Sequence, residues 1–162
     1  MAPLYSHPGM AFYWVLKKVH WSDGDAAGIA RFPNYFRWFE DAEEELFANA
    51  LGRSRQALLD AQGFGMPRVE AHITYQAPVR IGTLLRVGLD VRAENPRRLR
   101  HVFEMRDSAS DRPVAAGFVR VGCVSLADFA PRDFPDDIAQ FVQRIQSLAA
   151  AQADGAAPVP WA

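Results

Sequence analysis

Residues 21–38 read WSDGDAAGIARFPNYFRW. The stretch places two carboxylates, Asp23 and Asp25, and two glycines in a turn directly before a helix that is expected to begin at Asn34, after Pro33. The first backbone N–H groups of a helix have no partner within the helix and carry a partial positive charge. An oxygen that develops negative charge near Phe32 would therefore be stabilised, and Asp25 would lie beside it.

The sequence after this loop changes its period from helical to strand-like. One long helix ending at Gly52 is predicted from apolar residues at three- and four-residue steps, which are Tyr35, Trp38, Phe39, Ala42, Leu46 and Ala50. Its opposite face carries Asp41, Glu44 and Glu45 and is expected to be solvated. A short helix is predicted over residues 54–63, and a last one begins near Ile138. Strands are predicted over residues 12–21, 69–75, 85–92, 99–106 and 115–126.

The order of these elements is one strand, one long helix and then four strands. Strands and helices do not alternate after the first pair, which favours an α+β fold in which an antiparallel sheet of five strands wraps around one long central helix. That arrangement is the hot-dog fold.

The motif also resembles a known family. Asp-x-Asp-x-x-Gly, followed by an aromatic residue, Pro-Asn-Tyr and Arg-Trp, is similar to the hot-dog-fold acyl-CoA thioesterases of the 4-hydroxybenzoyl-CoA thioesterase type. The resemblance is dense over residues 19–40 and extends as a hydrophobic pattern over residues 12–126. It implies that Asp25 is the catalytic carboxylate and that the backbone N–H of Phe32 polarises the thioester carbonyl. Asp23 is expected to be structural.

Further site residues follow from the motif, from the resemblance and from position. Gly28, Tyr35 and Glu40 are assigned to substrate binding, and His72 joins them because it falls on the polar face of a predicted strand. Arginine's fork of N–H donors suits phosphate. The resemblance assigns coenzyme A phosphate binding to three arginines that follow the turn at Asn95-Pro96, namely Arg97, Arg98 and Arg100.

Other chemistries fit the residues less well. The two carboxylates could simply end a strand in a turn, but a calcium loop would need oxygen ligands where Ala27 and Asn34 stand. There is no Gly-x-Ser-x-Gly element, no Asp-Asn-Pro-x-His-like element of a hydratase, and no metal-ligand spacing among the histidines, which are His7, His20, His72 and His101. No metal and no cofactor are expected, because coenzyme A would be part of the substrate.

The expected reaction is hydrolysis of an acyl-CoA thioester. Asp25 would act as a nucleophile or as a general base, and both roles remain open. An aromatic acyl group is the first expectation, with a short or medium aliphatic group as the alternative. A non-catalytic acyl-CoA-binding module on the same fold is the competing hypothesis.

Length and composition limit the remaining possibilities. The 162 residues predict a single domain over residues 1–148 and an Ala- and Pro-rich, flexible tail over residues 149–162. A net charge of −1 gives no indication of a nucleic-acid or membrane partner. The lone Cys123 is expected to be buried and unreactive, which fits a cytoplasmic protein. An uncovered sheet edge and the resemblance predict a homodimer or homotetramer.

Overall fold

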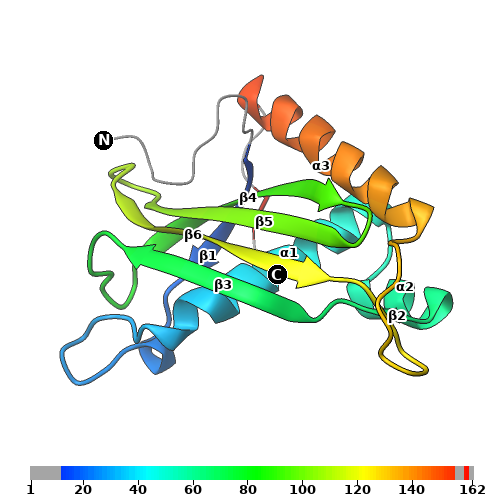
Figure 1. Ribbon diagram of the computed structural model, residues 1–162. Helices are drawn as coiled ribbons and strands as arrows, with labels where there is room; N and C mark the ends of the chain where they lie inside the picture. Colours follow the sequence, from blue (N-terminus) through cyan, green and yellow to red (C-terminus); the bar gives the residue numbers. More distant parts are fainter. Residues whose placement is uncertain (1–11, 156–158, 161–162) are drawn as a thin grey trace.

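The computed structural model describes residues 12–155 and 159–160. Five antiparallel strands form the main sheet in the order β3-β6-β5-β4-β1, and the two-residue β8 (Val159–Pro160) adds in parallel to β1. The long strands are β1 (Tyr13–Lys18), β3 (Arg68–Tyr75), β4 (Leu84–Asn95), β5 (Arg98–Asp107) and β6 (Pro113–Gly122). The predicted α+β hot-dog architecture is confirmed, with β3 as an outer strand of the sheet (Figure 1).

The central helix α1 (Pro33–Leu51) packs on one face of this sheet (Figure 1). Its apolar stripe joins the inward-facing residues of the strands in one core, in which Trp38, Phe39 and Leu46 are fully buried. Gly52 ends the helix with a φ of 68°, a left-handed conformation that glycine adopts at no steric cost. The short α2 (Arg55–Gln62) follows, capped by the Ser54 hydroxyl, which accepts from the Ala57 N–H.

The C-terminal helix is longer than the sequence pattern predicts. α3 (Asp136–Ala153) extends five residues past Leu148 into the segment expected to be a tail. Two features explain the extension: Ala149 is 2% exposed and belongs to the core, and the Gln152 side chain hydrogen-bonds both backbone groups of Trp14 in β1. The predicted strand over residues 115–126 is also shifted, because β6 begins at Pro113 and ends at Gly122. The separate pair β2 (Phe64–Gly65) and β7 (Val124–Ser125) forms beyond its end.

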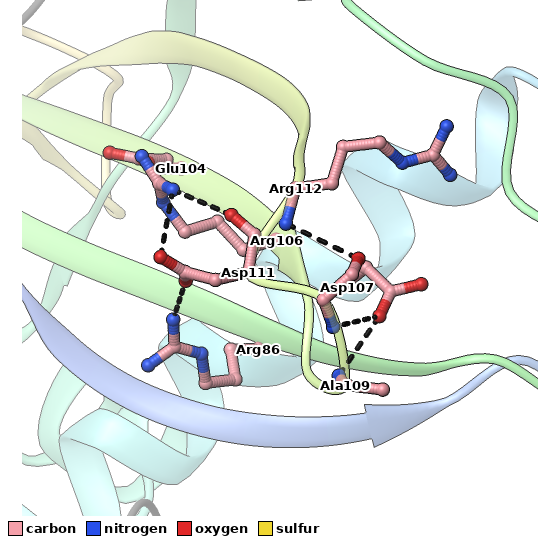
Figure 2. A network of polar contacts seen from close by, with 8 residues as sticks. Arg86, Glu104, Arg106, Asp107, Ala109, Asp111 and Arg112 are labelled. Carbon is pink, nitrogen blue, oxygen red and sulfur yellow. Dashed lines mark hydrogen bonds and ion pairs between the residues drawn. The ribbon is translucent and has the colours of Figure 1, made fainter.

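The turn between β5 and β6 is held by a polar network (Figure 2). The Asp107 carboxylate accepts from the Ala109 and Ser110 N–H groups, and Asp111 pairs with both Arg86 of β4 and Arg106 of β5. The Arg112 guanidinium donates to the Pro78 carbonyl at 3.2 Å. This hydrogen bond joins the turn to the segment after β3, which lines a cavity beside the start of α1.

Candidate active site

Asp23 anchors the loop that carries the motif. Its side chain is 3% exposed, accepts from the His20 N–H at 2.8 Å and pairs with Arg37 of α1. Its carbonyl accepts from the Arg31 N–H and from the Asn34 side chain. The loop is thus tied to the first turn of α1, which explains why a buried carboxylate is tolerated at this position.

Asp25 lies two residues further on, in the exposed part of the same loop. Its backbone N–H donates to the Ile29 carbonyl, and Gly28 closes the turn by donating to the Asp25 carbonyl. Gly28 has a φ of 74°, which explains the glycine at this motif position. The Asp25 Oδ1 accepts from the Ala27 N–H at 2.8 Å, whereas Oδ2 contacts no donor within the described chain. Asp25 therefore presents a carboxylate oxygen that is available to an incoming group.

The start of α1 presents an available donor. The helix begins at Pro33, one residue before the expected start, so the first helical residue has no N–H at all. The Asn34 and Tyr35 N–H groups donate to the Arg31 and Phe32 carbonyls. Across residues 12–155 the Phe32 N–H has no acceptor, and the Phe32 side chain is 70% exposed. A negatively charged oxygen placed here would meet both this N–H and the positive end of the helix dipole.

Two cavities follow the seam between α1 and β3. The first, of about 290 Å³, lies at the helix start and is lined by Ile29, Ala30, Phe32, Tyr35 and residues 75–78. The Tyr75 hydroxyl donates to the Phe32 carbonyl at 3.2 Å and so joins β3 to the helix start. The second, of about 220 Å³, is lined by Phe36, Phe39, Glu40, Arg68, Ala71 and Val119. Two of the expected substrate-binding residues, Tyr35 and Glu40, therefore line cavities on this seam.

His72 lies on the other face of the sheet. It pairs in register with Phe118, and the two rings stack at 5.8 Å, while its neighbour Ala71 lines the second cavity. Successive side chains of a strand point to opposite faces. The sheet therefore separates His72 from both seam cavities within one subunit, contrary to its expected place in the substrate cleft.

The expected phosphate-binding arginines lie at the far end of the sheet from Asp25. The Asp25 loop contacts residues 79–82, just before β4 begins, whereas Arg97 and Arg98 follow the turn after β4 ends. β4 has twelve residues, so these ends are about 35 Å apart at roughly 3.3 Å per residue. Arg97 and Arg98 are exposed, and Arg97 pairs with Asp133. The Arg100 guanidinium lies over the Phe118 ring at 4.2 Å. One subunit does not bring these arginines to Asp25.

The sequence pattern missed a buried ionic cluster centred on Glu43. This residue is fully buried, not part of a solvated helix face, and its carboxylate lies 2.5 Å from both Arg55 Nη1 and His101 Nδ1 and also pairs with Arg68. Burial alone would raise the pKa of Glu43, but its interactions with His101, Arg68 and Arg55 outweigh burial and lower the pKa from 4.5 to about 2. The cluster joins α1, α2, β3 and β5.

Other sequence predictions concern metals, membranes and Cys123. Among the described residues, no group of His, Cys, Asp or Glu side chains is arranged to hold a metal ion. None of the helices within residues 12–155 is long and apolar enough to cross a lipid bilayer. Cys123 is buried as expected, and its burial raises the pKa of the thiol.

Comparisons with known proteins define the class. Residues 19–142 match the family model described as the Thioesterase-like superfamily. The chain belongs to this family, in agreement with the hot-dog fold.

Individual proteins similar to this chain are named as hydrolases or thioesterases of acyl-CoA. The chain is 29% identical over 122 residues to a 1,4-dihydroxy-2-naphthoyl-CoA hydrolase of Thermosynechococcus vestitus, covering 75% of this chain and 82% of the relative. It is 26% identical to acyl-CoA thioesterase YbgC of Haemophilus influenzae, covering 75% and 87%. A 1,4-dihydroxy-2-naphthoyl-CoA thioesterase from Synechocystis, Slr0204, has the same fold with a TM-score of 0.76 at 21% identity, covering 82% and 96% of the two chains.

Proposed function

We propose that this acyl-CoA thioesterase hydrolyses an aromatic acyl-CoA, with Asp25 as its catalytic carboxylate and the Phe32 N–H as its oxyanion donor. The observation that carries the proposal is the pairing of an exposed carboxylate with an N–H that has no acceptor in the described chain, on one loop fixed by Asp23. The aromatic preference is supported by the names of relatives such as the dihydroxynaphthoyl-CoA hydrolase. A short or medium aliphatic group remains the alternative substrate.

The proposed chemistry follows from these two groups. The thioester carbonyl oxygen would accept from the Phe32 N–H, which stabilises the negative charge that develops when the carbonyl carbon is attacked. Ionised Asp25 would attack that carbon itself and form an anhydride that water then hydrolyses, or it would take a proton from the attacking water. Coenzyme A would leave as the thiol in either route. The walls of the first cavity, mostly apolar, would surround the acyl group.

The aromatic preference can be tested with a panel of acyl-CoA substrates. We expect kcat/KM for benzoyl-CoA and 2-naphthoyl-CoA to exceed the values for butyryl-CoA and hexanoyl-CoA, because the seam cavities are lined by Phe36, Phe39, Tyr35 and Tyr75, whose flat rings pack against an aromatic acyl group. The measurement is the initial rate of thiol release at several substrate concentrations. Higher kcat/KM for both aliphatic substrates would replace the aromatic assignment with the aliphatic alternative.

The distance between Asp25 and the arginines supports a site shared by two subunits. In the part of the chain that the structure describes, β3 has a strand partner, β6, on one side only, and its Val69 and Tyr75 are 47% and 44% exposed. If two β3 edges pair antiparallel about a two-fold axis, the Tyr75 end of one strand meets the Arg68 end of the other. Arg97 and Arg98 of the partner subunit would then lie at the same end of the joined sheet as Asp25.

This model predicts that Arg97→Ala and Arg98→Ala raise KM for acyl-CoA more than they lower kcat. Phosphate contacts lie far from the reacting carbon and stabilise bound substrate and transition state alike. The measurement compares an acyl-CoA with the matching acyl-pantetheine, which lacks the nucleotide, and KM for acyl-pantetheine should stay unchanged. Arg144→Ala, an exposed arginine on α3, is the matched control. Equal sensitivity of the two substrates would refute phosphate binding by Arg97 and Arg98.

The shared site also predicts complementation between two defective subunits. Asp25→Asn subunits and Arg97→Ala/Arg98→Ala subunits are each impaired, but a mixed dimer would contain one intact site, with Asp25 from one subunit and both arginines from the other. We expect mixing to restore activity at low substrate concentration, and light scattering to give a dimer of about 36 kDa, twice the 18.1 kDa chain, or a multiple of it. A fully active monomer, or mixtures no more active than the average of their parents, would contradict the shared site.

A further inference from the structure

The Glu43 cluster reaches the second seam cavity through one side chain, that of Arg68. Arg68 is 27% exposed and lines the cavity together with Glu40. Its Nη2 pairs with buried Glu43 and lies 3.7 Å from Glu40 Oε1. Because the pKa of Glu43 is held near 2, that carboxylate is ionised at neutral pH and keeps the guanidinium in place. Arg68 is therefore a fixed group and not a mobile surface side chain.

Arg68 and Glu40 keep hydrogen-bonding groups that a ligand in the second cavity could use. Among the described residues, Arg68 contacts Glu43 and Glu40 through Nη2, and the N–H groups on its Nε and Nη1 have no acceptor there. Glu40 is half exposed, and Arg68 is its one ion-pair partner in the part of the chain that the structure describes. A hydroxyl group both donates and accepts, so it could donate to the Glu40 carboxylate while it accepts from the guanidinium. A second carboxylate would be repelled by Glu40.

The rest of the second cavity fits an aromatic ring that carries such a hydroxyl group. Phe36, Phe39, Ala71 and Val119 supply apolar walls, and the charged pair Arg68 and Glu40 completes the lining. Phe32 and Glu40 are eight residues apart, which corresponds to about 12 Å along α1 at 1.5 Å per residue. A ring system whose thioester lies at the Phe32 N–H would thus extend along the seam toward Arg68.

We propose that Arg68, fixed by Glu43, is a specificity-determining residue that together with Glu40 recognises a hydroxyl group on the side of the acyl ring away from the thioester. This inference rests on the proposed thioesterase function and adds to it the residues that select the ring substituent. Arg68 does not contact the reacting atoms, so its removal should change the choice of substrate more than the chemistry itself.

The experiment compares substrates that differ by one hydroxyl. The two pairs are 4-hydroxybenzoyl-CoA with benzoyl-CoA, and 6-hydroxy-2-naphthoyl-CoA with 2-naphthoyl-CoA. The wild type should prefer the hydroxylated member of at least one pair in kcat/KM by roughly 10- to 100-fold, the size expected for hydrogen bonds to charged groups. Arg68→Met should reduce this preference to near one, and Arg144→Met should leave it unchanged.

A second variant separates recognition from folding. Arg68→Met leaves buried Glu43 with one ion-pair partner fewer and can lower stability, whereas Glu40→Ala removes only an exposed carboxylate and should still reduce the hydroxyl preference. A purely structural role of Arg68 would lower both members of a pair equally, and an unchanged ratio in the two variants would overturn the inference alone. If the wild type turned over none of the four substrates, the proposed function would fail and the inference with it.

Discussion

Asp25→Asn is expected to lower kcat for acyl-CoA hydrolysis by roughly two to four orders of magnitude, the scale for removal of a group that attacks or takes a proton. The amide keeps the shape of the carboxylate but performs neither step. The fold should be unaffected, since Asp25 is exposed and its side-chain hydrogen bond from the Ala27 N–H is also available to an amide oxygen. The measurement is kcat by thiol release, beside the unfolding temperature.

The matched control for this variant is Asp60→Asn, which changes an exposed carboxylate on α2 that accepts from Gln56. Its kcat should equal that of the wild type. Asp23→Asn should cost less activity than Asp25→Asn but more stability, because Asp23 is buried and pairs with Arg37. Near-wild-type turnover by Asp25→Asn would show that this carboxylate is not the catalytic group.

Among the substitutions discussed, Glu43→Ala should lower the free energy of unfolding most, by about 3–5 kcal/mol. This loss is typical for removing one partner of a buried ionic cluster. The substitution leaves Arg55, Arg68 and fully buried His101 without their shared carboxylate. Glu44→Ala is the control, since Glu44 also pairs with Arg55 but is 46% exposed and should cost at most about 1 kcal/mol. Denaturant titration measures both, and equal losses would show that the cluster adds little to stability.

The same cluster predicts a pH dependence. The pKa of Glu43 is lowered by folding from 4.5 to about 2, so its stabilising contribution is fully present above pH 4.5 and is lost as the pH falls toward 2. The stability difference between the wild type and Glu43→Gln should therefore shrink as the pH falls from 4.5 toward 2. A difference that stayed constant down to pH 2 would show that Glu43 does not gain from being ionised.

The buried position of Glu43 was not predicted from the sequence. Glu43 was not among the carboxylates expected on the solvated face and was given no role, although it lies four residues after Phe39 and four before Phe47, on the buried stripe of the helix. His101 is likewise at an inward-facing position, because it alternates along β5 with Leu99 and Phe103, which are both buried. Periodicity therefore identifies both positions as inward-facing, but only the tertiary structure shows that their charges meet.

The fold and the motif loop were more predictable than the extended site. Turn residues and hydrophobic periodicity predicted the loop, the long helix and the order of the strands. The structural role expected of Asp23 is confirmed by its contacts with His20 and Arg37. Residues 149–153 of the predicted tail are helical, because the buried position of Ala149 and the contacts of Gln152 outweigh local composition. The places of Arg97 and His72 depend on strand register, which no short stretch of sequence specifies.

The central claim is that this chain turns over an acyl-CoA thioester and does not merely bind one. Its most direct test is the time course of thiol release from 2-naphthoyl-CoA in large excess over the wild-type protein, with binding followed in parallel by calorimetry on Asp25→Asn. The account predicts linear release through many equivalents of enzyme, and binding without release by the variant. Saturable binding to the wild type with no release above the uncatalysed rate would contradict it and identify an acyl-CoA-binding module.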